Sequence, residues 1–191
     1  EKTRFDALKN KVPKAIQALK EFVQAAAEHD IAPPHPYLAI LSMDGDSMGK
    51  TLSALQTKEA HSTFSDVLKQ FAENDVERIV EQEHLGRLVY AGGDDVLALV
   101  SVRDALAVAE KLRTEFEDKV RNVEYKLADD TPKKGIKNHQ GESVTASTGI
   151  AFVHHTHDLQ SAVQAANDAQ KDIAKEYYGR NAIGIQFLRR S

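Results

Sequence analysis

Two adjacent carboxylates, Asp94 and Asp95, stand at the predicted tip of a β-hairpin, where residues 92–95 have the sequence Gly-Gly-Asp-Asp. Apolar runs at 86–91 and 96–100 predict the two strands of this hairpin. Paired glycines supply the positive φ angles that a tight two-residue turn requires. Because neighbouring carboxylates repel each other, the tip predicts a bound cation. A hard divalent ion with oxygen ligands is the candidate.

A second acidic segment follows the apolar run 37–43, whose near-continuous hydrophobicity is typical of a strand buried on both faces. Asp44 ends this strand, and Asp46 follows two residues later, either as a third ligand or as the former of an Asx-turn. If the strand pairs beside the hairpin, Asp44 converges with Asp94 or Asp95. The small residues that follow let backbone N–H groups approach phosphate oxygens. Together the two segments predict a metal-dependent site for nucleoside triphosphates.

The composition of the 191-residue chain limits the class of protein. Its length predicts one domain, or one domain with an appendage, and a hydrophobic content of 41% is sufficient for a core. The absence of cysteine excludes disulfides and cysteine-ligated zinc, and we expect a cytoplasmic protein. No apolar run is long enough to span a membrane, so no membrane partner is expected. The net charge of −4 argues against a generally basic nucleic-acid surface but permits a nucleotide that arrives with its own magnesium.

The elements that must position the carboxylates follow from the hydrophobic periodicity. Residues 1–36 are predicted as a helical lead-in, with Pro13 as a possible break, that ends in a proline-rich connector at 29–36. Residues 37–191 form the second domain. Residues 123–142 within it are polar and predict a mobile loop. The other elements of this domain are expected as helices at about 58–82, 102–121 and 159–176 and as further strands at 143–153 and 182–188.

The resulting order, β-α-β-β-α-β-α-β, predicts an α+β fold with a ferredoxin-like core. We expect a mixed, mainly antiparallel sheet with helices packed on one of its faces. With this order and the two acidic segments, the chain resembles the palm domain of the large polymerase/cyclase-like subunit of type III CRISPR effector complexes, in its Cmr branch. More distantly, it is similar to GGDEF diguanylate cyclases and class III nucleotidyl cyclases. The segments that carry the resemblance are 37–50, 86–99, 146–151 and 178–182.

This resemblance implies an ATP-dependent nucleotidyltransferase that makes cyclic oligoadenylate when target RNA binds the complex. Asp44, Asp94 and Asp95 would be the catalytic residues. With the Gly45 carbonyl, they would also bind two Mg²⁺ or Mn²⁺ ions, which polarise the α-phosphate and neutralise the pyrophosphate. The residues expected to contact the nucleotide and its phosphates are Asp46, Ser47, Met48, Gly49, Lys50, Gly92, Gly93, Lys175 and Arg180.

Two cations near the C-terminal helix end have alternative roles. In the distant GGDEF pattern, a lysine and the arginine of a Gly-Arg-Asn triplet grip the triphosphate, and residues 179–181 match that triplet. The match implies a phosphate contact for Arg180. Lys175 stands one residue farther from the triplet than the pattern has it, which leaves its role open. The alternative for both cations is a favourable interaction with the helix macrodipole.

The resemblance also implies partners. Family members hold two palms face to face, of which one carries Gly-Gly-Asp-Asp, so this chain would supply half of a two-nucleotide site and would lack efficient catalysis alone. The implied partners are ATP, a second palm domain and other subunits of the ribonucleoprotein, with crRNA and target RNA reached through the complex. Two alternatives stay open: a stand-alone cyclic (di)nucleotide cyclase that acts as a homodimer, and a catalytically silent nucleotide-binding structural module. The base preference cannot be deduced from these residues.

Overall fold

The computed structural model describes residues 2–29, 35–127 and 129–189, with side chains from residue 12 onward. The chain divides into two compact units, residues 1–35 and 36–191, and each is described by itself. Most of the connector predicted at 29–36 lies outside the described residues. Within the described ranges, every helix is too short or too polar to span a lipid bilayer.

The N-terminal unit contains one long helix, α1 (Lys2–Glu28). The helix continues through Pro13, so the possible break predicted there is wrong. Proline removes one backbone donor, but the helix-forming lysine, alanine, leucine and glutamine residues around it retain the remaining hydrogen bonds. Several apolar side chains of α1 are exposed: Val12, Ile16, Leu19, Phe22 and Val23.

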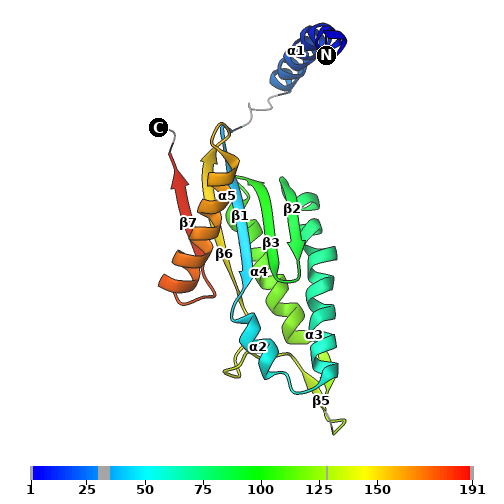
Figure 1. Cartoon of the computed structure of the whole chain (residues 1–191), viewed down its shortest axis with the longest axis vertical. Helices are drawn as coiled ribbons and strands as arrows, with labels where there is room; N and C mark the ends of the chain where they lie inside the picture. The colour runs from blue at the N-terminus through cyan, green and yellow to red at the C-terminus, as the bar shows by residue number, and fades with distance from the viewer. Residues whose placement is uncertain (1, 30–34, 128, 190–191) are drawn as a thin grey trace. The chain divides into compact units, whose positions relative to one another are not determined.

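A five-stranded sheet forms the centre of the second unit, with β2 at one edge and β7 at the other (Figure 1). Its strands are β1 (Tyr37–Gly45), β2 (Gly86–Gly92), β3 (Asp95–Ser101), β6 (Ala146–His154) and β7 (Ile183–Leu188). β1 pairs antiparallel with β3 and β6, and β2 pairs antiparallel with β3. β7 extends this ferredoxin-like order by pairing parallel with β6. The predicted α+β fold with a mixed, mainly antiparallel sheet is confirmed.

Helices cover both faces of this sheet, so the prediction of helices on one face is wrong. On one face, Leu41 of β1 belongs to the same core cluster as Phe64 and Phe116. On the other face, Ile40 is buried with Ala166. A central strand with apolar residues on both sides needs cover on both sides, which explains the near-continuous apolar run in β1.

The helices alternate between regular α-helix and wider π-helical turns. The α-helices are α2 (Met48–Ala54), α3 (Lys58–Gln70), α4 (Ala105–Asn122) and α5 (Leu159–Asp168). The π-helical segments are η1 (Phe71–Asp75), η2 (Arg78–Gln82) and η3 (Ala169–Tyr177). One face of the sheet is covered by α3, η1, η2 and α4. The other face is covered by α5 and η3.

Parts of the segment 123–142, which is predicted as a mobile loop, form secondary structure, and the mobility of the segment stays a prediction. β4 (Glu124–Lys126) and β5 (Pro132–Lys134) pair in a small antiparallel sheet. Ile136 is 1% exposed, and its N–H donates to the Val120 carbonyl at 3.1 Å. The burial of this isoleucine against α4 anchors a segment whose other residues are mostly polar.

The second helical layer, formed by α5 and η3, approaches the sheet closely because glycines of the sheet line the contact. A Cβ atom on Gly149 would lie 2.0 Å from the Ala166 carbonyl oxygen and 2.3 Å from the Gln170 backbone nitrogen. A Cβ atom on Gly184 would lie 2.0 Å from the Ala169 carbonyl oxygen. Neither gap accommodates a side chain, so these two glycines set the distance between η3 and the sheet.

Gly149→Ala is therefore expected to destabilise the chain by about 1–3 kcal/mol, because the added methyl group pushes α5 and η3 away from β6. The measurement is the free energy of unfolding in urea. Gly49→Ala is the control, since nothing lies within 4 Å of its Cβ position. Gly49 lies in the first turn of helix α2, so this control is expected to leave stability equal to or slightly above that of wild type. If Gly149→Ala is as stable as wild type, the close approach of α5 and η3 to β6 is contradicted.

Candidate active site

The hairpin that carries the two aspartates turns through Gly93 and Asp94, since Gly92 pairs with Asp95 at the end of the ladder. Gly93 has a φ of 68°, a conformation that favours glycine. Gly92 does not share this conformation, so the expectation that both glycines supply positive φ angles is wrong. A Cβ atom on Gly92 would lie 2.0 Å from the hydroxyl oxygen of Tyr90. One glycine therefore shapes the turn, and the other makes room for a tyrosine ring.

The two acidic segments meet where β1 and β3 lie side by side. Met43 pairs with Val96 near the end of this ladder. Asp44 and Asp95 therefore stand at the same end of the sheet, close enough for Asp44 to raise the pKa of Asp95. The antiparallel register of two strands, rather than their proximity in sequence, brings these side chains together.

Asp94 approaches the same place from the turn. Its Oδ2 atom lies 2.5 Å from the position that a Cβ atom on Gly45 would take, and the Met48 side chain crowds that position equally. A side chain at residue 45 would have to displace both neighbours. The absence of a side chain at Gly45 thus lets the Asp94 carboxylate lie close to Asp44. The structure brings together the four predicted metal ligands: Asp44, Gly45, Asp94 and Asp95.

The ammonium group of Lys175 lies among these carboxylates. Its Nζ atom donates to Asp44 Oδ2 and, at 2.9 Å, to the Gly45 carbonyl oxygen. The same Nζ atom lies 4.0 Å from Asp46 Oδ1. Gln170 donates a longer hydrogen bond of 3.4 Å to Asp44 Oδ2. The Lys175 side chain is only 13% exposed, whereas the Asp44 side chain is 40% exposed, so water reaches this ion pair from the Asp44 side.

The π-helical geometry of η3 explains how Gln170 and Lys175 reach the same carboxylate. In a π-helix the backbone hydrogen bonds join residues five apart, so residues i and i+5 lie near each other. Such a turn holds one residue more than an α-helical turn. It therefore accommodates the one-residue displacement of Lys175 from the triplet at 179–181. Sequence analysis missed Gln170, and this displacement was the available signal of a widened turn.

The carboxylates perturb one another. Partial burial, the hydrogen bond with Asp44 and the negative charges of Asp44 and Asp94 together raise the pKa of Asp95 to about 6. The pKa of Asp94 is also raised, chiefly by burial and further by the charge of Asp44. Lys175 acts in the opposite direction on both groups without cancelling these effects. The cluster thus carries more negative charge than this ammonium neutralises.

The donors in this cluster fit a hard divalent cation. Carboxylate and carbonyl oxygens are the ligands that Mg²⁺ takes in proteins, and it is usually held by one or two carboxylates together with substrate phosphates. The Lys175 ammonium already contacts two such oxygens, on Asp44 and Gly45. Among the described residues, no group of three aspartate, glutamate or histidine side chains is arranged to hold an ion by itself. The metal ligands therefore stay a prediction.

Asp46 occupies a structural position beside the cluster. It is 4% exposed and accepts hydrogen bonds from Thr145 Oγ1 at 2.8 Å, from Ser147 Oγ at 2.7 Å and from the Asn181 backbone N–H at 2.9 Å. Because three donors occupy its two oxygens, we assign Asp46 to fastening the turn at 179–181 against β6. Its contact with the nucleotide stays a prediction.

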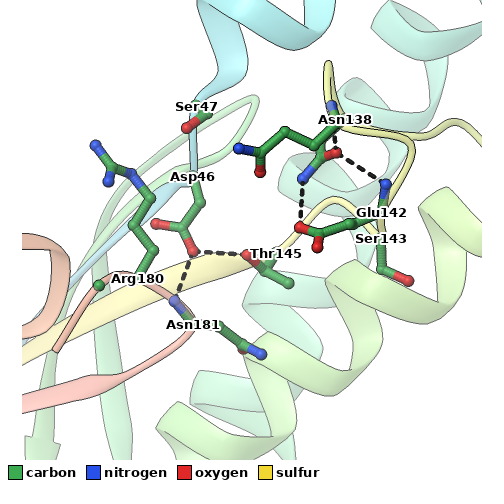
Figure 2. A pocket seen from close by; sticks show the side chains of 10 residues that line it. Asp46, Ser47, Asn138, Glu142, Ser143, Thr145, Arg180 and Asn181 are labelled. Atoms are coloured by element: carbon green, nitrogen blue, oxygen red, sulfur yellow. Dashed lines mark hydrogen bonds between the residues drawn. The ribbon is translucent and has the colours of Figure 1, made fainter.

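A polar cavity of about 330 Å³ opens beside Asp46 (Figure 2). Ser47 and Arg180 line it near Asp46, and the segment 138–145 lines it from the other side. Ser47, Arg180 and Asn181 all have positive φ angles, of 57°, 79° and 49°. Backbone strain of this kind persists where surrounding contacts impose it and concentrates at functional sites. Guanidinium and hydroxyl groups on this wall are suitable donors for phosphate oxygens.

A second cavity, of about 320 Å³, adjoins the hairpin on the side of α3. Gly92 and Gly93 form part of its wall. Leu68 of α3 and Ala72 of η1 supply aliphatic groups, and Ser65 adds a hydroxyl. The two predicted nucleotide-binding glycines thus lie at a different cavity from Ser47 and Arg180.

The remaining predicted phosphate contacts begin α2. Met48, Gly49 and Lys50 form its first turn, where backbone N–H groups have no partner within the helix. The Ser47 side chain does not cap this helix. These positions adjoin the polar cavity at Ser47. Their contact with phosphate stays a prediction.

Comparison with known proteins identifies relatives of this chain. The family model for the second palm domain of Cas10/Cmr2 matches residues 37–184. The CRISPR system Cmr subunit Cmr2 of Pyrococcus furiosus is 34% identical, in an alignment that covers 96% of this chain and 22% of that protein. This chain therefore spans about a fifth of the length of the curated relative.

Solved structures share the fold at low sequence identity. A Csm1–Csm4 cassette in complex with cA3 matches with a TM-score of 0.60 and 16% identity, over 77% of this chain and 20% of that chain. The diguanylate cyclase SiaD of Pseudomonas aeruginosa, in complex with its activator SiaC, matches with a TM-score of 0.52 and 19% identity. That match covers 91% of this chain and 57% of the cyclase. These neighbours show that the second unit has a cyclase-like palm fold.

Asp95→Asn is expected to change how the stability of the metal-free chain depends on pH. Folding raises the pKa of Asp95 from 3.8 to about 6. Between roughly pH 4 and pH 6 the folded state thus binds more protons than the unfolded state, and stability falls as the pH rises through this range. The variant lacks this contribution, so its stability relative to wild type should increase from about pH 4 to pH 6 and then level off.

Urea unfolding in EDTA at successive pH values measures this difference. Asp172→Asn, which changes an exposed aspartate of η3, is the control and should follow the wild-type curve. Parallel curves for Asp95→Asn and wild type would show that the carboxylates do not interact as described.

Proposed function

The chain belongs to the family of the second palm domain of Cas10/Cmr2, and from that premise we propose that it is the nucleotidyltransferase palm of a type III CRISPR effector complex. The proposed reaction joins ATP molecules into cyclic oligoadenylate. The observation that carries the proposal is the meeting of Asp44, Asp94 and Asp95 at one end of the sheet.

The proposed chemistry is a nucleotidyl transfer. The 3′-hydroxyl oxygen of one nucleotide attacks the α-phosphorus of another. The bond from that phosphorus to the bridging oxygen breaks, pyrophosphate leaves and the hydroxyl proton is released. Two Mg²⁺ or Mn²⁺ ions, held by Asp44, Asp94, Asp95 and the Gly45 carbonyl, would neutralise the phosphate charge and lower the pKa of the attacking hydroxyl.

The two cavities support a placement for ATP across this cluster. The polar cavity begins at Asp46, next to Gly45, and its Arg180 guanidinium can bind two phosphate oxygens at once. The second cavity includes Gly93, next to Asp94, and its aliphatic groups suit the faces of an adenine ring. ATP with its triphosphate in the first cavity and its base in the second would present the α-phosphate to the carboxylates.

The proposed activity needs partners. A second palm facing this one would supply the other nucleotide, and other subunits would carry crRNA and bind target RNA. The Cmr2 relative is a subunit of a Cmr system and is several times longer than this chain. We therefore expect cyclic oligoadenylate from the assembled complex rather than from this chain alone. A cyclic dinucleotide formed by the isolated chain would favour a stand-alone homodimeric cyclase instead.

Changing Asp94 and Asp95 together to asparagine is expected to lower cyclic oligoadenylate synthesis by the assembled complex at least about 100-fold, because the charge that holds the metal ions is lost. Mass spectrometry of the products formed from ATP in the presence of target RNA measures the effect. Target-RNA binding should be unchanged. Asp172→Asn is the matched control for loss of an aspartate elsewhere on the palm. Undiminished synthesis by the double variant would refute the proposed site.

Arg180→Met is expected to weaken ATP binding roughly 10- to 100-fold, the effect of losing a charged hydrogen bond to phosphate. Calorimetry with ATP and Mn²⁺ measures the affinity. Arg103→Met is the control, because Arg103 is exposed and lies outside both cavities. Equal ATP affinity of Arg180→Met and wild type would exclude the polar cavity as the phosphate site.

A further inference from the structure

Lys175 stands where a metal ion of the proposed site is expected. Its ammonium contacts the Asp44 carboxylate and the Gly45 carbonyl oxygen, which are the two predicted metal-binding groups of β1. Gln170 contacts the same oxygen of Asp44 and helps to hold this arrangement. A positive charge at this point offsets part of the repulsion among the carboxylates.

A divalent ion and this ammonium cannot share the same oxygens. Mg²⁺ binds oxygen at about 2.0–2.1 Å, whereas Lys175 Nζ lies 2.9 Å from the Gly45 carbonyl oxygen. An ion on that oxygen and on Asp44 would touch the ammonium. Two positive charges in contact repel each other strongly in partly buried surroundings. A metal ion bound to both Asp44 Oδ2 and the Gly45 carbonyl oxygen therefore displaces the lysine side chain.

The polar cavity lies within a short movement of the Lys175 ammonium group. Lys175 Nζ lies 4.0 Å from Asp46 Oδ1, and Asp46 lines that cavity together with Ser47 and Arg180. The flexible four-carbon stem of lysine allows a short movement in this direction. Asp46 is a poor final partner, because Thr145, Ser147 and Asn181 already donate to its two oxygens. Phosphate oxygens in the cavity would be a better one.

We propose that Lys175 is an exchangeable internal cation, which offsets the charge of the carboxylates and transfers to the nucleotide phosphates when metal binds. This inference rests on the proposed function and adds a coupling to it. Metal alone must displace the ammonium without giving it a new partner. Metal that arrives with ATP also brings the phosphate that receives it. Through Lys175, bound metal thus increases the affinity for nucleotide, and bound nucleotide increases the affinity for metal.

The test is calorimetric binding of Mn²⁺ to the 191-residue chain without nucleotide. Lys175→Met removes the competing charge but keeps the apolar stem, so it is expected to bind Mn²⁺ about tenfold more tightly than wild type. At saturating Mn²⁺ the same variant should bind ATP at least about tenfold more weakly. A lysine with a merely structural role would not produce opposite changes. Unchanged or weaker Mn²⁺ binding would overturn the exchange.

Two further variants keep the test informative. Lys171→Met is the matched control, because Lys171 is an exposed lysine of the same helical segment, and both of its affinities should equal those of wild type. Lys175→Gln keeps a hydrogen-bond donor near the Gly45 oxygen without the charge, and it replaces Lys175→Met if circular dichroism shows that the latter is unfolded. At equal Mn²⁺ concentration, the folded Lys175 variant should gain more in Tm than wild type. An equal gain counts against the exchange.

The outcomes separate this inference from the proposed function. If the wild-type chain binds no Mn²⁺ even in the presence of ATP, the metal-dependent site itself is refuted, and the exchange with it. If wild type binds Mn²⁺ with ATP but loss of the Lys175 charge gives no gain in Mn²⁺ affinity without ATP, only the exchange is refuted.

Discussion

Repulsion among the carboxylates of Asp44, Asp94 and Asp95 is the constraint on which the rest of the site depends. Crowding and burial raise the pKa of Asp94 and Asp95, so the folded chain bears a cost for bringing them together. Lys175 offsets part of that cost through its ion pair with Asp44. We propose that this negative charge attracts a metal ion and that the surrounding structure determines when the ion replaces the lysine.

The packing of η3 against the sheet places the Lys175 ammonium group beside Asp44. Gly149 and Gly184 leave no room for side chains under the second helical layer, so η3 lies close enough to the sheet for Lys175 to reach β1. The widened turn of η3 directs Gln170 to the same carboxylate. Asp46 then ties the turn after η3 to β6. Backbone proximity, helix geometry and a buried hydrogen-bond network thus act together on one ion pair.

The cyclase-like palm fold is shared with proteins that differ greatly in sequence. A common fold does not by itself imply a common reaction, because function depends on the groups placed on it. In this chain the proposed groups are the carboxylates at the sheet end and the residues that line two cavities of different polarity. The chain spans about a fifth of the length of its Cmr2 relative.

The sequence by itself determined the five strands of the main sheet, their order, the hairpin and the family, because period-two hydrophobicity, glycine turns and short motifs are local patterns. It also identified the aspartates that the sheet register brings together. Tertiary structure decided what local patterns do not contain: the helices on both faces, the two short strands within 123–142 and the burial of Asp46. It also decided the partner of Lys175, which lies 131 residues from Asp44 in the chain. That contact depends on the distance between a helix and a sheet, and side-chain packing across the whole unit sets this distance.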